Sequence, residues 1–261
     1  MESGQPDDAA QLSGAVSFRT QGSMFAPLLT ARRTLRLNAA RVRTARRPRF
    51  EGESFPVPKA ALRDSSQDRA LRMLDVIGAA LALLLLAPVL TLIALGVRLS
   101  SPGPVLFRQT RFGRHGKPFT ILKFRTMTCQ EDGPQVRQAC RNDPRVTPFG
   151  ALLRKLSLDE LPQLFNVLGG SMSLVGPRPH PVSLDWSFSR TLPGYGYRFA
   201  VRPGITGLAQ VRGLRGEIFS DEQIRQRVLH DAVYVRRRSV LLYLQVLIAT
   251  VALVFFQSEA Y

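Results

Sequence analysis

The sequence predicts a mainly helical α+β protein associated with a membrane. Three patterns predict this fold class: a long uncharged run with a proline in it (Val76–Val97), two alternating segments around a glycine-containing turn, and a second apolar run directly after three arginines (Val240–Phe256). The first favours a re-entrant helix-break-helix, the second a short β-hairpin, and the third an interfacial amphipathic helix.

The charge of the chain is strongly unbalanced. It carries 36 Lys and Arg against 19 Asp and Glu, a formal charge of +17. Such a surface attracts nucleic acid, anionic lipid or phosphorylated substrates, and charge alone does not distinguish them. Cys129 and Cys140 are too few for a zinc site or a disulfide framework, and the three histidines are scattered.

The first 68 residues are polar or basic and have no sustained hydrophobic period, with the densest positive charge in residues 31–50. This composition is typical of a solvated arm that lies against anionic lipid. A nucleic-acid-binding arm would carry the same charge, but no recognised DNA- or RNA-binding motif accompanies it. We therefore expect residues 1–68 to form a basic, flexible arm, and we expect no nucleic acid among the partners.

Residues 69–100 contain the uncharged run. Its 22 residues, at ~1.5 Å each, would form a helix long enough to cross a hydrocarbon layer of ~30 Å. Pro88 should bend that helix, and the basic flanks on both sides favour the cytoplasmic side for both ends. A re-entrant hairpin broken at Pro88 satisfies both observations. A kinked transmembrane helix also tolerates proline, so the residues leave both arrangements open.

Residues 101–238 resemble a soluble domain. Alternating residues on either side of Gly113–Lys117 predict two strands and a turn, helical patterns follow around 150–168 and 221–238, and the Gly- and Pro-rich segments between them predict loops. Residues 239–261 contain a final apolar run of 17 residues, which is marginal for a crossing. An interfacial helix is favoured over a second span, because arginines precede it at the level of lipid headgroups.

The stretch LSLDELPQ admits two interpretations. Ser157 and Glu160 fit a helix capping box, which would place Asp159 and Glu160 in a first turn where the helix dipole favours negative charge. Pro162 argues against a purely structural role, because it would remove an intrahelical hydrogen bond. A carboxylate at a helix start can also serve as an oxygen nucleophile or a metal ligand.

Four cations are candidates for phosphate binding. Arg178 lies between two prolines that fix its backbone, and a guanidinium suits bidentate contact with phosphate oxygens. Lys123 and Arg125 are two residues apart on a predicted strand and should share a face. Arg202 opens RPGITG, a glycine-containing turn whose amides could approach a phosphate. Each has a plain structural alternative: a bond to a carbonyl, a solvated face, or a simple turn.

These motifs stand in an ordered series that resembles the bacterial sugar transferase family, the monotopic phosphoglycosyl transferases of polysaccharide initiation. The resemblance covers about residues 69–256. It includes Arg72 and Asp75 before the apolar run, and then SPGPVLFRQTRFGRHGKPFTILKFRTM, DPRVTPFGALLRKLSLDELPQLFNVLGGSMSLVGPRP, RPGITGLAQVRG and YVRRRS. A match over several long blocks is far more specific than any single motif among them.

The resemblance implies a function and a site. Members transfer a sugar-1-phosphate from a nucleoside diphosphate sugar to undecaprenyl phosphate, and they need a divalent cation, usually Mg²⁺. We expect a UDP-hexose as the donor here. The family's acidic dyad falls on Asp159 and Glu160. Asp159 would be the nucleophile and metal ligand, forming an aspartyl-phosphosugar intermediate, with Glu160 as its partner in orientation or proton handling.

The resemblance also implies a location and partners. The protein would sit at the cytoplasmic face of the bacterial inner membrane, with residues 101–238 as its catalytic domain and with anionic lipid and downstream glycosyltransferases as further partners. Two departures stand out: Ala87 replaces the serine of the family's Ser-Pro break, and Tyr243 stands where members commonly have aspartate. A catalytically inactive membrane scaffold of the same fold is the alternative to an enzyme, and the intact dyad favours the enzyme.

Overall fold

The computed structural model describes residues 54–58, 67–128, 143–216 and 220–256. All of them belong to one of the two units of the chain, residues 39–261. Most of the predicted basic arm, and both cysteines, lie outside the described residues. Those described form a mainly helical α+β fold with one long apolar helix and two small two-stranded sheets, which confirms the predicted fold class at this level.

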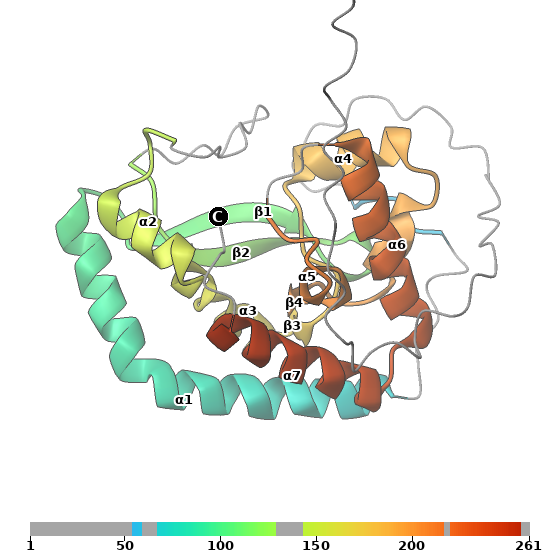
Figure 1. Cartoon of the computed structure of the whole chain (residues 1–261), viewed down its shortest axis with the longest axis horizontal. Helices are drawn as coiled ribbons and strands as arrows, with labels where there is room; N and C mark the ends of the chain where they lie inside the picture. Colours follow the sequence, from blue (N-terminus) through green and yellow to red (C-terminus); the bar gives the residue numbers. More distant parts are fainter. Residues whose placement is uncertain (1–53, 59–66, 129–142, 217–219, 257–261) are drawn as a thin grey trace, which may run out of the picture. The chain divides into compact units, whose positions relative to one another are not determined.

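The apolar run lies within α1 (Asp68–Ser100), a helix of 33 residues that bends about midway along its length (Figure 1). Pro88 lies inside α1 and explains the bend, because proline lacks the N–H donor and clashes with the preceding turn. Leu71 and Val97, near the two ends, are buried, whereas Leu84 is 72% exposed. Among the described residues, α1 is the one helix long and apolar enough to cross a membrane.

The predicted β-hairpin is present. β1 (Leu106–Phe112) pairs antiparallel with β2 (Pro118–Phe124), and the short 3-10 helix η3 (Arg114–Gly116) closes the turn. Gly116 has a positive φ of 71° and lies so close to residue 55 that a Cβ there would meet its carbonyl oxygen at 2.1 Å. This position therefore requires glycine both for its backbone conformation and for the close approach.

The capping-box interpretation of the acidic stretch is wrong. α2 (Pro148–Lys155) ends before the stretch, and Ser157 adopts a left-handed conformation (φ 56°) and makes no side-chain cap. The acidic pair then lies in the 3-10 turn η4 (Leu158–Glu160). Pro162 is the N-cap of the next helix, α3 (Gln163–Leu168), where its missing N–H interrupts no helical hydrogen bond. One predicted helix is thus two helices joined by a tight acidic turn.

The Gly- and Pro-rich segments are not only loops. They contain β3 (Ser173–Val175) and β4 (Gly204–Thr206), which form a short parallel pair. Three helical elements flank them along the chain, and these are α4 (Val182–Thr191), η5 (Tyr195–Ala200) and α5 (Leu208–Val211). Strands of three residues carry too little periodicity to be found from the sequence, and here a contact between distant segments creates them.

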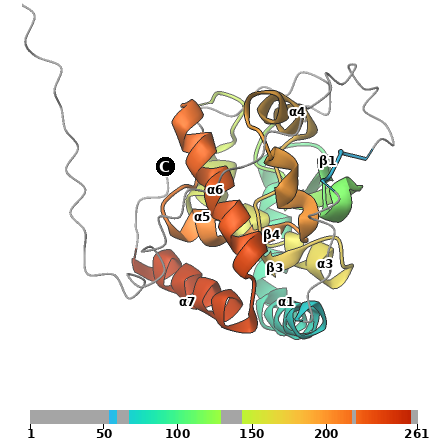
Figure 2. The same cartoon turned by 90° about the vertical axis from the view of Figure 1, so that its right-hand side faces the viewer.

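Two helices complete the fold. α6 (Asp221–Arg237) is capped at its start by Ser220, whose hydroxyl accepts a hydrogen bond from the backbone N–H of Gln223. The predicted C-terminal helix is α7 (Val240–Phe256), and it lies beside the first part of α1 (Figures 1 and 2). One face of α7 is buried around Tyr243, while the leucines, isoleucine and valine of the other face are exposed: Leu241, Leu244, Ile248 and Val251.

Candidate active site

The acidic turn η4 is held in place from two sides. Leu158 and Leu161 flank the acidic pair and pack against the apolar cluster that joins α1, α2 and β2. Asn166, on α3, reaches the edge strand: its amide donates to Thr120 O (2.7 Å) and its oxygen accepts from Leu122 N (2.9 Å). These contacts fix the turn against the strand that carries Lys123. Asn166 was not predicted, because it satisfies backbone groups that are distant in the sequence.

Lys123, Arg178 and the dyad come together as one site. Lys123 Nζ lies 2.8 Å from Glu160 Oε1 and 4.0 Å from Asp159 Oδ2. The Arg178 guanidinium approaches Glu160 with both terminal nitrogens, one at 3.0 Å from Oε2 and the other in a short contact with Oε1. This is a bidentate pair reinforced by a lysine, an arrangement that fixes the planes of both groups.

The two carboxylates of the dyad have different surroundings. Burial alone would raise the pKa of Glu160, but the charges and hydrogen bonds of Arg178 and Lys123 outweigh it and hold the pKa far below its usual value. Burial raises the pKa of Asp159, and the neighbouring Glu160 charge adds to this while Lys123 opposes it. Within the described residues no hydrogen bond reaches the Asp159 carboxylate. Glu160 is therefore held by close ion pairs, whereas among these residues the buried Asp159 carboxylate has only the longer contact with Lys123 and accepts no hydrogen bond.

A buried polar network supports the loop that carries Arg178. Arg198 donates to the carbonyl oxygen of Arg178 and pairs with Asp231 (3.1 Å) and Asp185 (3.2 Å). It also donates to His180 Nδ1 (2.7 Å), which is an acceptor because burial first, and then the charge of Arg198, lower the His180 pKa well below its ordinary value. The loop is thus held through both backbone and side chain, a role that the isolated letters PRPHP do not indicate.

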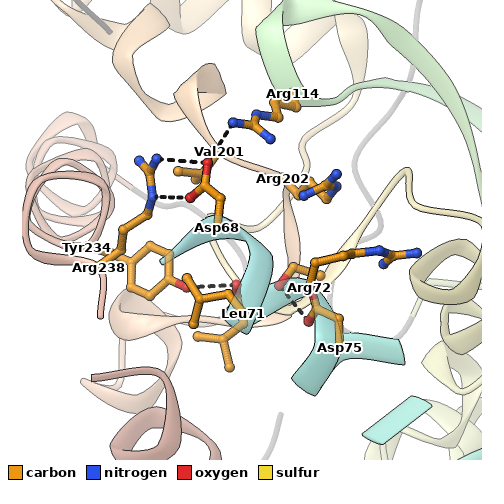
Figure 3. A pocket seen from close by; sticks show the side chains of 11 residues that line it. Asp68, Leu71, Arg72, Asp75, Arg114, Val201, Arg202, Tyr234 and Arg238 are labelled. Atoms are coloured by element: carbon orange, nitrogen blue, oxygen red, sulfur yellow. Dashed lines mark hydrogen bonds and ion pairs between the residues drawn. The ribbon is translucent and has the colours of Figure 1, made fainter. Parts of the chain in front are cut away.

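Arg125 and Arg202 do not join the dyad. Arg125 is buried and donates to Pro102 O (2.7 Å) and to Ser101, which ties the segment after β2 to the end of α1. Its strand has ended one residue earlier, so the alternation that would place it beside Lys123 no longer applies. Arg202 donates from Nε to Gly170 O (2.9 Å) and lies in a separate cavity beside the start of α1 (Figure 3).

The donor groups limit how a metal could be held. No cluster of three or more His, Cys, Asp or Glu side chains occurs in the part of the chain that the structure describes. Both oxygens of Glu160 are engaged by cations, which leaves Asp159 as the dyad carboxylate open to a metal ion. A single carboxylate suits Mg²⁺, which is often bound through one or two carboxylates together with substrate phosphates and water.

An acidic dyad beside a lysine and an arginine suits chemistry on phosphorylated groups, and the long apolar helix indicates association with a membrane. Comparison with known proteins specifies the class. Residues 66–257 match the family described as Bacterial sugar transferase. The chain belongs to this family and is a sugar-phosphate transferase.

Particular relatives refine the comparison. A UDP-glucose:undecaprenyl-phosphate glucose-1-phosphate transferase of Caulobacter vibrioides is 52% identical over 206 residues, which are 79% of this chain and 75% of that protein. The protein of the same name in Escherichia coli K12 is 48% identical over 209 residues, 78% of this chain but 45% of that protein. The exopolysaccharide production protein PSS of Rhizobium leguminosarum is 45% identical over 186 residues, 69% and 92% of the two chains. The chain thus spans less than half of the Escherichia coli relative.

Proposed function

We propose that this protein transfers glucose-1-phosphate from UDP-glucose to undecaprenyl phosphate with release of UMP, as the first membrane step of exopolysaccharide synthesis. The names of the Caulobacter and Escherichia coli relatives supply the substrates, and that of the Rhizobium relative supplies the polysaccharide class. The observation that carries the proposal is the difference between the two carboxylates of the dyad: Glu160 is bound closely by Lys123 and Arg178, while the buried carboxylate of Asp159 accepts no hydrogen bond from the described residues.

The reaction proceeds in two balanced displacements. An Asp159 carboxylate oxygen attacks the phosphorus that bears the sugar, a bond forms between them, and the bond from that phosphorus to the UMP oxygen breaks. The UMP leaves with the electron pair of the broken bond. An oxygen of the lipid phosphate then attacks the same phosphorus, the bond to Asp159 breaks, and the carboxylate is regenerated. One site thereby serves a soluble donor and a lipid acceptor in turn.

Glu160 acts as a positioning residue in this scheme. Its two oxygens orient the Arg178 fork and the Lys123 ammonium beside Asp159. Those cations stabilise the negative charge that moves from the donor to the departing UMP. We do not assign Glu160 a role in proton transfer, because both of its oxygens already accept hydrogen bonds from Lys123 and Arg178. Neither displacement needs a proton.

In this proposal Asp159 also holds a Mg²⁺ ion. When bound, the ion neutralises phosphate charge and orients the phosphate oxygens. The chain itself supplies one ligand, and the remaining positions suit substrate oxygens and water.

Purified Asp159→Asn should release no UMP from UDP-glucose and undecaprenyl phosphate. The matched control is Asp221→Asn, an exposed aspartate in the first turn of α6, which should retain wild-type turnover. With UDP-[¹⁴C]glucose and no acceptor, the wild type should retain label in a hydroxylamine-sensitive form and Asp159→Asn should retain none. Full activity of Asp159→Asn refutes the nucleophile assignment, whereas an inactive wild type supports the scaffold alternative.

The identity of the sugar needs its own test. UMP release is compared for UDP-glucose, UDP-galactose and UDP-N-acetylgalactosamine at equal concentration. We expect the highest kcat/KM for UDP-glucose. Preference for another sugar would overturn the glucose assignment while leaving the nucleophile assignment intact.

We also propose that α1 is a re-entrant hairpin in the bacterial inner membrane, with residues 101–238 as a catalytic domain on the cytoplasmic face and α7 at the interface. Three features support this arrangement. α1 bends, both of its ends are packed against the same unit, and its middle exposes leucines such as Leu84 and Leu85, at 72% and 74%. The exposed apolar face of α7 beside it extends the same surface. The basic arm, residues 1–68, would add contact with anionic lipid.

Cysteine labelling tests the hairpin. In a background lacking Cys129 and Cys140, the exposed positions Ala70→Cys and Ser100→Cys should both react with a membrane-impermeant maleimide only after the cytoplasmic side is opened. Reaction of one position from outside would demonstrate a true span. Deletion of residues 2–50 should weaken binding to anionic vesicles and preserve turnover in detergent. Loss of that turnover would instead make the arm a part of the site.

A further inference from the structure

A small cavity lies between the start of α1, the end of α6 and the segment before β4 (Figure 3). Its volume is about 30 Å³, far below the several hundred Å³ typical of sites for drug-sized ligands. No residue of the dyad, and neither Lys123 nor Arg178, lines it. The cavity is therefore distinct from the candidate active site and can admit only a compact group.

Arginine dominates the charge of the cavity. Four arginines and two aspartates line it, an excess of two positive charges: Arg72, Arg114, Arg202, Arg238, Asp68 and Asp75. Both aspartates are already engaged. Asp68 pairs with Arg114 (2.9 Å) and Arg238 (3.0 Å), while Asp75 Oδ1 accepts from Ser173 (2.8 Å) and from Tyr243 (2.7 Å). Of the four arginines, Arg72 and Arg202 are the two that form no ion pair among the described residues.

Arg72 and Arg202 use their donors unequally. Arg72 donates to the carbonyls of Val167 (2.6 Å) and Leu168 (2.9 Å) at the end of α3, which fixes its guanidinium without neutralising it. Arg202 is fixed only through Nε, by Gly170 O. Among the described residues its two terminal nitrogens have no hydrogen-bond partner, although the side chain is half-buried. A fork of this kind is suited to two oxygens of one anion.

The neighbours of Arg202 strengthen this reading. In Figure 3 its side chain lies between those of Arg114 and Arg72. Burial, followed by the charges of Arg114 and Arg72, lowers the pKa of Arg202. Three guanidinium groups around one cavity repel one another, so an anion bound among them would relieve the repulsion and supply the missing acceptor.

The place of the cavity indicates the source of the anion. Arg72 lies one helical turn before Val76, where the apolar part of α1 begins, and Arg238 lies two residues before α7. Both apolar helices thus begin beside the cavity. A membrane that receives them brings its headgroups to the level of these arginines, and lipid phosphates are the anions of that layer.

We propose that Arg72, Arg114 and Arg202 form a binding site for the phosphate of an anionic membrane phospholipid, separate from the acidic dyad. The site docks the enzyme at a defined point beneath the two apolar helices. A free phosphate ion has the same binding chemistry, so the test compares both sources.

Calorimetric titration of the full-length protein in detergent with dihexanoyl phosphatidylglycerol tests the site. Arg202→Gln should weaken binding about tenfold or more, the loss expected for one charge-assisted contact. The matched control is Arg190→Gln, an exposed arginine on α4, which should bind like the wild type. Arg202→Lys should recover part of the affinity, because lysine restores the positive charge but lacks the two terminal nitrogens of the guanidinium. Melting temperatures of the variants show that each is folded.

The ligand arms separate the outcomes. Tight phosphatidylglycerol binding together with weak inorganic phosphate binding, both dependent on Arg202, supports the lipid source. Equal Arg202-dependent affinity for inorganic phosphate overturns the lipid source in favour of a free anion. Unchanged affinity in a folded Arg202→Gln overturns the site itself. Asp159→Asn should bind phosphatidylglycerol as the wild type does, so this test is independent of the proposed reaction.

Discussion

Replacing Arg178 with lysine should impair turnover without removing the positive charge. Arg178 contacts both oxygens of Glu160, and lysine can match only one of them at a time. One charge-assisted hydrogen bond is therefore lost, and such a bond contributes about 1.5–3 kcal/mol. If the Arg178–Glu160 ion pair positions the charge of residue 178 beside the departing phosphate, kcat/KM falls by about 10- to 150-fold. The Arg178 side chain is 30% exposed, which favours the lower part of that range.

The assay is initial-rate UMP release over a series of UDP-glucose concentrations at saturating undecaprenyl phosphate. Arg190→Lys, on the exposed side of α4, is the matched control and should leave kcat/KM unchanged. Melting temperatures establish that both variants are folded. A kcat/KM for Arg178→Lys within twofold of the wild type would show that the bidentate geometry is dispensable, and the positioning role of Glu160 would fail with it.

Three further predictions concern stability and are measured as melting temperatures. Tyr243→Phe removes the hydrogen bond to Asp75 (2.7 Å) and should destabilise the protein by about 1 kcal/mol; an unchanged melting temperature would mean that the bond adds nothing. Gly150→Ala would place a Cβ 2.2 Å from the backbone oxygen of Thr126 and should cost about 1–3 kcal/mol, whereas Ala151→Ser on the exposed face of α2 should be neutral. Burial lowers the pKa of His180, so this side chain is neutral in the folded protein. The contribution of the neutral ring to the free energy of unfolding is therefore complete above about pH 6.5. It is lost as the pH falls, because His180 in the unfolded chain then takes up a proton. His180→Asn keeps an acceptor for Arg198 and should lose less stability than the wild type between pH 6.5 and pH 5; Asp185, with its pKa raised to about 6, titrates in the opposite sense in both proteins, and parallel pH curves would contradict the assignment.

Local patterns predicted the elements whose signals are local. Alternation around Gly113–Lys117 predicted β1 and β2. The uncharged run predicted a long apolar element broken or kinked at Pro88, and the structure has one continuous helix that bends there without a break. The predicted capping box fails because Ser157 adopts a left-handed conformation and its side chain makes no cap, while Leu158 and Leu161 on either side of the dyad pack into the core. A local pattern carries no information about such packing.

The site was predictable only in part for the same reason. Lys123, Arg178 and the dyad meet because α3 docks on β2 and the PRPHP loop is anchored by Arg198. Arg125 was grouped with Lys123 by strand periodicity, which ends with the strand at Phe124. The position of Arg202, just before β4, is set by the pairing of β4 with β3. These two strands are about 30 residues apart in the sequence, and no residue pattern predicts their contact.

The short segment 54–58 is packed against the same unit as α1, although it precedes that helix in the sequence. Phe55 is buried among the rings of Phe112, Trp186 and Phe199, and its N–H donates to Gly116 O (2.8 Å). Only residues 59–66 connect this anchor to the start of α1, so its docking is intramolecular, with an effective concentration in the millimolar range. If residues 1–66 were removed and a peptide covering residues 50–58 were added separately, the peptide would need a similar concentration to occupy the Phe55 position as fully as the connected segment does.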